Sequence, residues 1–123
     1  MRSITLFALA FTLLTTSAHA QQFSDKDRQA TSTWYAQHQT KPPVGFREQD
    51  RLSSDQESRL QVGQKLDPEL MSKRHPVPVT LRRQLPAPGP TYQYSAVGGH
   101  VVVVDKKTSV VHDVIHVLDK VTR

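Results

Sequence analysis

Two histidines four residues apart are the first candidates for chemistry in this sequence. They are the first and last residues of the segment His112-Asp113-Val114-Ile115-His116. On a helix, two histidines at this spacing can share one zinc ion, but the β-branched neighbours favour a strand. In a strand both imidazoles would lie on one face, yet about 13 Å apart, which is too far for one ion with bonds of about 2 Å. The segment also lacks the glutamate of a zinc hydrolase, so it does not predict one.

A third histidine, His100, precedes another β-branched run and can join one of these histidines across a sheet. If Asp105 pairs with Thr108, His100 falls opposite Asp113, and His100 and His112 lie on opposite faces. A slip of one residue reverses this arrangement. The candidate metal ligands are therefore His100, His112, His116 and Asp113, of which strand geometry lets at most two approach one ion.

The supply of other metal ligands is small. The chain has no cysteine, and its two methionines are Met1 and Met71, so imidazoles are the available borderline-soft ligands. Two exposed imidazoles leave most coordination positions to water. We expect weak contact with a divalent transition-metal ion at most, no tighter than the micromolar range of about −8 kcal/mol, and no resident cofactor. The alternative is that these histidines are ordinary residues of a sheet surface.

The whole chain has a formal charge of +5, and the positive charge is concentrated in one part of it. Residues 70–104 contain no acid, and their basic residues are Lys73, Arg74, Arg82 and Arg83. One interpretation is a contact surface for an anionic partner, such as lipid headgroups, polysaccharide or an acidic protein. The other is a solvated surface. No aromatic residues are interleaved with the basic ones, which argues against binding to nucleic acid.

Signs of catalysis are missing from the sequence. There is no Gly-rich phosphate loop, no G-x-S-x-G elbow and no cysteine nucleophile in the 123 residues. A chain of this length has little room for a walled pocket. We therefore expect a protein that is not an enzyme.

The first twenty residues have the layout of a secretory signal peptide. Arg2 precedes an apolar stretch, and Ala18-His19-Ala20 forms a small-residue cleavage site before Gln21. The apolar stretch is shorter than the roughly 20 residues that span a bilayer, and no later stretch is longer. We expect cleavage after Ala20, a periplasmic location and no transmembrane segment in the mature protein.

Residues 21–123 predict one small α+β domain, in which short N-terminal helices pack on a C-terminal three-stranded antiparallel β-meander. Helix starts are expected at three caps: Ser24, Ser54 with Glu57 reaching back, and Asp67 before Pro68. Residues 21–75 would be the helical part and residues 76–90 a Pro-rich basic linker with a turn of helix near 80–85. Strands are expected near 91–97, 100–105 and 108–118. The expected core residues are Trp34, Tyr92, Tyr94, Val102, Val104, Val111, Ile115 and Val117.

The order of short motifs from Phe23 onward resembles the RcnB family of small exported bacterial proteins, including its anti-virulence branch of the CigR type. The matching segments are Phe23-Ser24-Asp25 before Trp34-Tyr35, Pro43-Val44-Gly45, residues 63–70, 76–86, 92–105 and 110–115. The resemblance implies a periplasmic accessory protein with no catalytic residues. The founding member acts in nickel and cobalt homeostasis beside an efflux system, and the other branch antagonises a virulence regulator. An envelope or inner-membrane protein is the partner that either role implies. The resemblance also makes nickel and cobalt the ions for which weak contact is expected.

Overall fold

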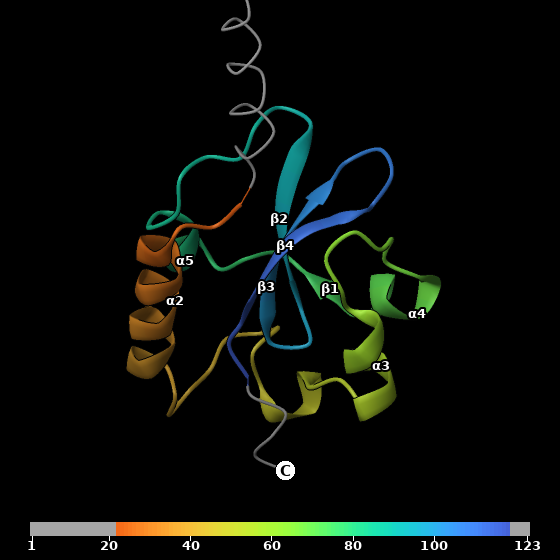
Figure 1. The fold of residues 1–123 in the computed structure, drawn as a ribbon. Coiled ribbons are helices and arrows are strands. Elements are labelled where there is room, and N and C mark those ends of the chain that lie inside the picture. The colour runs from red at the N-terminus through yellow and green to blue at the C-terminus, as the bar shows by residue number, and fades with distance from the viewer. Residues whose placement is uncertain (1–21, 119–123) are drawn as a thin grey trace, which may run out of the picture.

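A computed structural model describes residues 22–118, so the predicted signal peptide lies outside the described residues. The chain is α+β, and its antiparallel sheet has the strand order β1-β2-β3-β4 (Figure 1). The elements in chain order are α2 (Asp25–Gln37), the 3-10 helix η2 (Glu48–Asp50), α3 (Ser54–Arg59), α4 (Pro68–Met71), β1 (Arg74–His75), α5 (Val79–Arg82), β2 (Tyr92–Val97), β3 (His100–Asp105) and β4 (Val111–His116). The predicted meander is confirmed as β2, β3 and β4.

A fourth strand, β1, was missed by the prediction of three. It has only two residues, Arg74 and His75, which pair with Val97 and Ala96 of β2. A strand this short has no hydrophobic alternation to recognise. It lies at the end of residues 21–75, which were expected to be helical.

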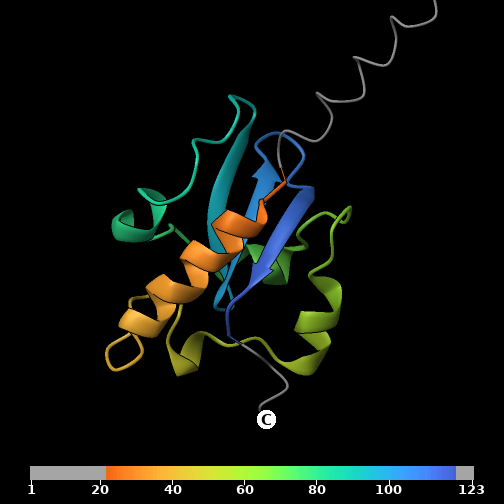
Figure 2. The same cartoon turned by 60° about the vertical axis from the view of Figure 1, so that its left-hand side comes forward.

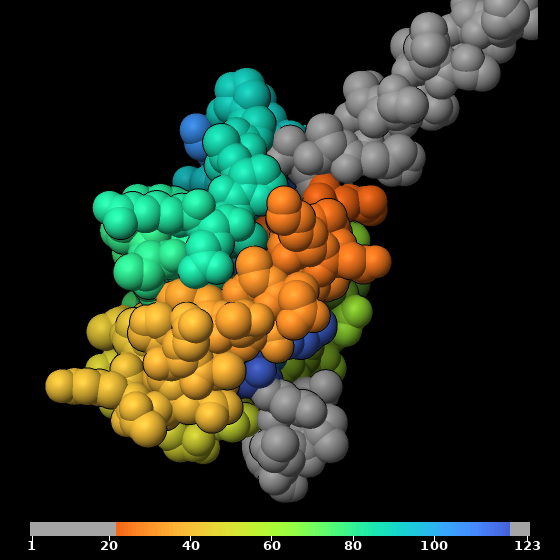
Figure 3. All heavy atoms as spheres, turned by 90° about the vertical axis from the view of Figure 1, so that its left-hand side faces the viewer, coloured from red at the N-terminus to blue at the C-terminus, as the bar shows by residue number. Residues whose placement is uncertain are grey.

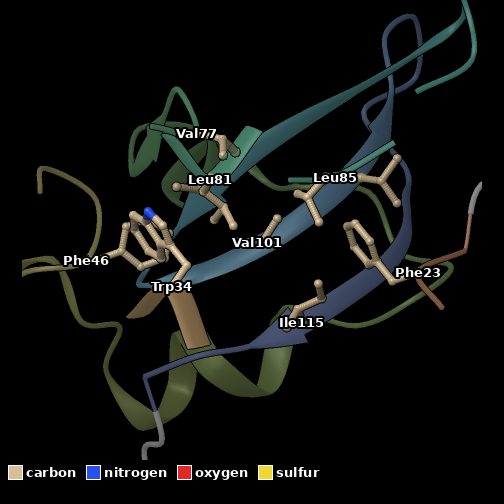
Figure 4. Packing of buried hydrophobic residues seen from close by; sticks show 10 residues of the cluster. Phe23, Trp34, Phe46, Val77, Leu81, Leu85, Val101 and Ile115 are labelled. Atoms are coloured by element: carbon tan, nitrogen blue, oxygen red, sulfur yellow. The ribbon is translucent and has the colours of Figure 1, made fainter. Parts of the chain in front are cut away.

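The helices cover both faces of the sheet. Figures 1 and 2 show α2 and α5 on one face and α3 and α4 on the other. The core on the α2 side includes Phe23, Trp34, Phe46, Val77, Leu81, Leu85, Val101 and Ile115 (Figure 4). The core on the α3 side contains Leu52, Leu60, Leu66, Leu70, Val97, Val102, Val104, Val111 and Val114. Because β3 is buried on both faces, its Val101–Val104 run reads as continuous rather than alternating.

Helix α2 begins as predicted. The Ser24 side chain accepts from the backbone N–H of Asp27, and the Asp27 carboxylate accepts from the N–H of Ser24. The helix is fixed to the sheet by Arg28, which binds Asp113 of β4, and to α5 by Trp34, whose indole N–H donates to Thr80. These docking contacts compensate for its thin apolar face.

Residues 76–90 pack closely against the rest of the domain. Val77, Leu81 and Leu85 are buried in the α2-side core. The segment lies beside α2 over one face of the molecule (Figure 3). The expected turn of helix forms as α5, at Val79–Arg82.

The predicted cap of the second helix is wrong by one residue. The N-cap of α3 is Ser53, whose side chain accepts from the N–H of Gln56, while the Gln56 side chain accepts from the N–H of Ser53. Both Ser53 and Ser54 can cap a helix, and the structure uses Ser53, which forms the capping box with Gln56 three residues later. Glu57 is thereby released from capping and turns into the protein. The third cap, Asp67 before Pro68, is confirmed.

The expected register of the last hairpin is also wrong. His100 pairs with His116 and not with Asp113, because the turn after β3 is longer than assumed and Val104 pairs with Val111. Val103 then pairs with Asp113, so His112 is the extra residue of a β-bulge. The bulge interrupts the alternation of side chains between the two faces of the sheet, so His112 and His116 lie on opposite faces.

Candidate functional site

His100 is buried at the start of β3, and both of its ring nitrogens have partners. It is 1% exposed. Its Nδ1 accepts from the backbone N–H of Val117 at 3.2 Å, and its Nε2 lies 2.7 Å from Oε2 of Glu57. A neutral ring that accepts at Nδ1 carries its proton on Nε2, so it donates to the Glu57 carboxylate.

His116 completes a group of three possible metal ligands. It is paired directly with His100 across the sheet, and the two ring centroids are 4.8 Å apart with the rings nearly perpendicular. One ligand atom each from Glu57, His100 and His116 lies within 4.8 Å of the others. We call these residues the Glu57–His100–His116 cluster. It unites a short helix with two strands.

The cluster resembles the ligand sets of transition metals. Two imidazoles and one carboxylate with further positions open form a recognised type of site for such ions. Ligand atoms on one tetrahedral ion with bonds near 2.1 Å lie about 3.4 Å apart. Binding would therefore require Nε2 of His100 to separate slightly from Glu57 and give up its proton, while the exposed His116 moves inward. The N–H of Val117 would keep the His100 ring oriented, as outer hydrogen bonds do for metal-binding histidines.

A hollow of about 860 Å³ lies next to the cluster, between β4 and α3. Glu57 and His116 line it, together with Leu52, Ser54, Ser58, Leu60, Gln61, Val62, Asp113 and Val114. His100 is fully buried and is not part of the lining. We refer to this space as the β4–α3 hollow.

Two of the four predicted ligands lie elsewhere. His112 packs edge-on against Tyr92 on the α2 side of the sheet, with ring centroids 4.7 Å apart. Asp113 is bound by Arg28 and by the N–H of Phe23 at 2.8 Å. Of the predicted set, the structure thus brings together His100 and His116 only. The role of Asp113 is to fix the start of α2.

Glu57 was missed as a candidate ligand. The capping box assigned to Ser54 gave Glu57 a local role, and its true partner is 43 residues away. One signal was available, since Glu57 is three residues before the buried Leu60 and so lies on the same helix face. A glutamate on the apolar face of a short helix indicates a buried polar partner.

The predicted basic residues lie in two segments of the chain. Arg74 lies in β1 and is half-buried, with Nη1 3.6 Å from Sδ of Met71. Arg82 and Arg83 are exposed at the end of α5, and Lys73 is half-buried just before β1. Their role as a contact surface stays a prediction.

No family model matches the chain, and no curated protein matches it. Among solved structures, the chain is similar to the C-terminal domain of inner membrane protein CigR from Salmonella enterica. The likeness covers 89% of this chain and 94% of that one, with a TM-score of 0.53 and 21% identity. The chain has the fold of the CigR C-terminal domain. At this identity the likeness concerns the CigR fold and not its role. Within residues 22–118, no helix has the length and apolar character required to cross a bilayer.

Proposed function

We propose that this domain is a non-enzymatic accessory protein of the bacterial periplasm that binds divalent transition-metal ions weakly and reversibly, in nickel and cobalt homeostasis beside an efflux system. The observation that carries the proposal is the Glu57–His100–His116 cluster. Its donor set of two imidazoles and a carboxylate suits nickel, cobalt, copper and zinc.

Weak binding follows from the state of the ligands before the metal arrives. Nε2 of His100 must lose both its proton and its hydrogen bond to Glu57 before it can coordinate. His116 is exposed and must be ordered. These costs favour a dissociation constant in the micromolar range, about −8 kcal/mol. Reversible binding at this level fits a protein that hands ions on better than one that stores them.

The periplasmic location is supported by two features. The sequence begins with a segment of signal-peptide layout, and the fold is shared with a domain of an inner-membrane protein. We infer that the mature chain begins at Gln21.

Calorimetric titration of residues 21–123 with Ni²⁺ and Co²⁺ tests the proposal. We expect saturable binding of one ion, weakened about tenfold or more by His116→Ala, which corresponds to about 1.4 kcal/mol or more. His116 is exposed, so this variant should keep the wild-type circular dichroism spectrum. His112→Ala is the matched control, because His112 faces the other side of the sheet, and its affinity should stay within about twofold of wild type.

Two results would contradict metal binding at this cluster. One is the absence of saturable heat with either ion. The other is an equal loss of affinity in His116→Ala and His112→Ala. A nanomolar affinity would contradict the weak, reversible role, since it would indicate a storage or resident site.

The second candidate function is regulation of an envelope or virulence system through contact with an inner-membrane protein. It is favoured by the shared fold with the CigR domain and by the exposed Arg82 and Arg83. Growth of a deletion strain across nickel and cobalt concentrations separates the two functions. Normal growth, together with loss of a crosslinked membrane partner in an Arg82→Glu, Arg83→Glu variant, would favour the regulator.

A further inference from the structure

The β4–α3 hollow is larger than the space that water ligands of a metal require. A water molecule occupies about 30 Å³ in the liquid, whereas the hollow measures about 860 Å³. That volume is typical of sites for small organic ligands. We propose that the hollow takes a small bidentate chelator of the α-amino-acid type, which completes the coordination of the metal. The domain would then bind a metal chelate more tightly than the hydrated ion. This inference rests on the proposed function.

The position of the cluster determines the direction in which the free coordination positions of a bound metal would point. His100 is buried and does not line the hollow, while Glu57 and His116 form part of its wall. An ion held by all three residues therefore has protein on the His100 side and the hollow on the other. The remaining coordination positions of such an ion would face the hollow, where a ligand could reach them.

The lining suits an amphipathic chelator. Leu52, Leu60, Val62 and Val114 provide apolar surface, and Ser54 and Ser58 provide hydroxyl groups. An α-amino acid can coordinate through its amine and one carboxylate oxygen, which leaves its side chain free to contact the apolar part. Contact of this kind adds affinity in proportion to the apolar area removed from water.

Charge balance favours the same class of ligand. Asp113 also lines the hollow, but its carboxylate is paired with Arg28. A divalent ion bound to the carboxylate of Glu57 therefore keeps one positive charge. The carboxylate of an amino acid cancels it, so the bound complex is neutral and its burial costs less than that of a charged one. A positively charged or neutral chelator lacks this advantage.

The test measures Ni²⁺ affinity of residues 21–123 by calorimetry, alone and with L-leucine present. Leucine that only competes for nickel would raise the apparent dissociation constant. The proposal expects the opposite, a decrease of about tenfold. N-acetyl-leucine is the chemical control, since its blocked amine cannot form the chelate, and it should leave the constant unchanged. In equilibrium dialysis, labelled leucine should be retained only when protein and nickel are both present.

A matched pair of variants locates the ligand. Val62 in the hollow is 57% exposed and Val44, outside the hollow lining, is 50% exposed, so both tolerate a larger side chain. Val62→Trp should fill the hollow and abolish the gain from leucine, measured as the ratio of the Ni²⁺ dissociation constants of the same variant with and without leucine. Val44→Trp should behave like wild type in both measurements.

Each outcome separates this inference from the proposed function. Nickel binding that leucine weakens would overturn the chelator inference and leave metal binding standing. A leucine gain that survives in Val62→Trp would overturn the hollow as its location. The absence of any nickel binding would overturn both.

Discussion

The Nε2 atom of His100 on β3 lies 2.7 Å from Oε2 of Glu57 on α3, and both residues are buried. Because α3 has only six residues, it cannot be stable on its own. The hydrogen bond fixes it to the sheet together with Leu60, which packs in the α3-side core. The same contact thus supports the fold and presents two of the three candidate ligands.

Replacing Glu57 with alanine should lower the free energy of unfolding by about 1–3 kcal/mol, because the buried Nε2–H of His100 would lose the Glu57 carboxylate as its acceptor. Glu57→Gln should cost less, since its amide oxygen can accept the same proton. Asp55→Ala is the control on the same helix: Asp55 is exposed and forms a surface pair with Arg59, worth about 0–1 kcal/mol. Urea denaturation measures all three. Equal losses in Glu57→Ala and Asp55→Ala would show that the buried contact adds nothing.

Local signals in the sequence predicted much of the fold. Ser24 and Asp67 were identified as caps because the bonds that they make span only three residues. The hairpin at Gly98-Gly99 followed from two β-prone runs, alternating tyrosines before the turn and the valines Val101–Val104 after it. β1 was missed because it acquires strand geometry only through pairing with Val97 and Ala96. Its formation is a tertiary effect.

The site was less predictable than the fold, for a physical reason. Which histidines meet depends on the register of β4, and one bulge at His112 changes the face of every residue before it relative to those after it. The contact between Glu57 and His100 depends on where α3 docks. Neither the bulge nor the docking has a local sequence signature in this chain.

The Gly98-Gly99 turn should tolerate no side chain at its second position. Gly99 has φ +84°, and a Cβ there would lie 2.1 Å from Cδ1 of Leu118. Gly63 provides a matched control, with φ +90° and no atom within 4 Å of its Cβ position. Gly63→Ala should therefore cost about 1–2 kcal/mol from the left-handed backbone alone. Gly99→Ala should cost clearly more in thermal or urea unfolding, and equal costs would contradict the overlap with Leu118.

Asp50 should make the free energy of unfolding depend on pH in the acid range. Burial alone would raise the pKa of its carboxyl, but hydrogen bonds from the Arg47 side chain and from the N–H groups of Arg47 and Gly45 outweigh this and hold the pKa below its usual value. A lowered pKa in the folded state adds stability that is present above the unfolded pKa of about 3.9 and is lost as the pH falls through the folded pKa. Asp50→Asn should therefore be less stable than wild type at pH 5–7. The difference in the free energy of unfolding between the two proteins should narrow below about pH 4. A difference that is independent of pH would contradict its assignment to the Asp50 carboxylate.

Asp113 should be important for docking of α2 and unimportant for metal. Its carboxylate accepts from the N–H of Phe23 at 2.8 Å and pairs with Arg28 at 2.9 Å. Asp113→Ala should lower the free energy of unfolding by about 1–3 kcal/mol and speed hydrogen exchange in α2. Affinity for Ni²⁺ should stay within about twofold, because Asp113 lies outside the Glu57–His100–His116 cluster. A large loss of nickel affinity in a folded Asp113→Ala protein would return this residue to the ligand set.

Export should remove the first twenty residues. Signal peptidases require small side chains at the end of the leader, which Ala18 and Ala20 supply. The intact mass of the protein recovered from the periplasmic fraction should therefore correspond to a chain that starts at Gln21. Ala20→Leu is the matched variant, since a large residue before the cleavage site should block processing and leave the uncleaved mass in the membrane fraction. A wild-type mass that retains residues 1–20, or a protein found only in the cytoplasm, would contradict export and with it the periplasmic role proposed for the metal site.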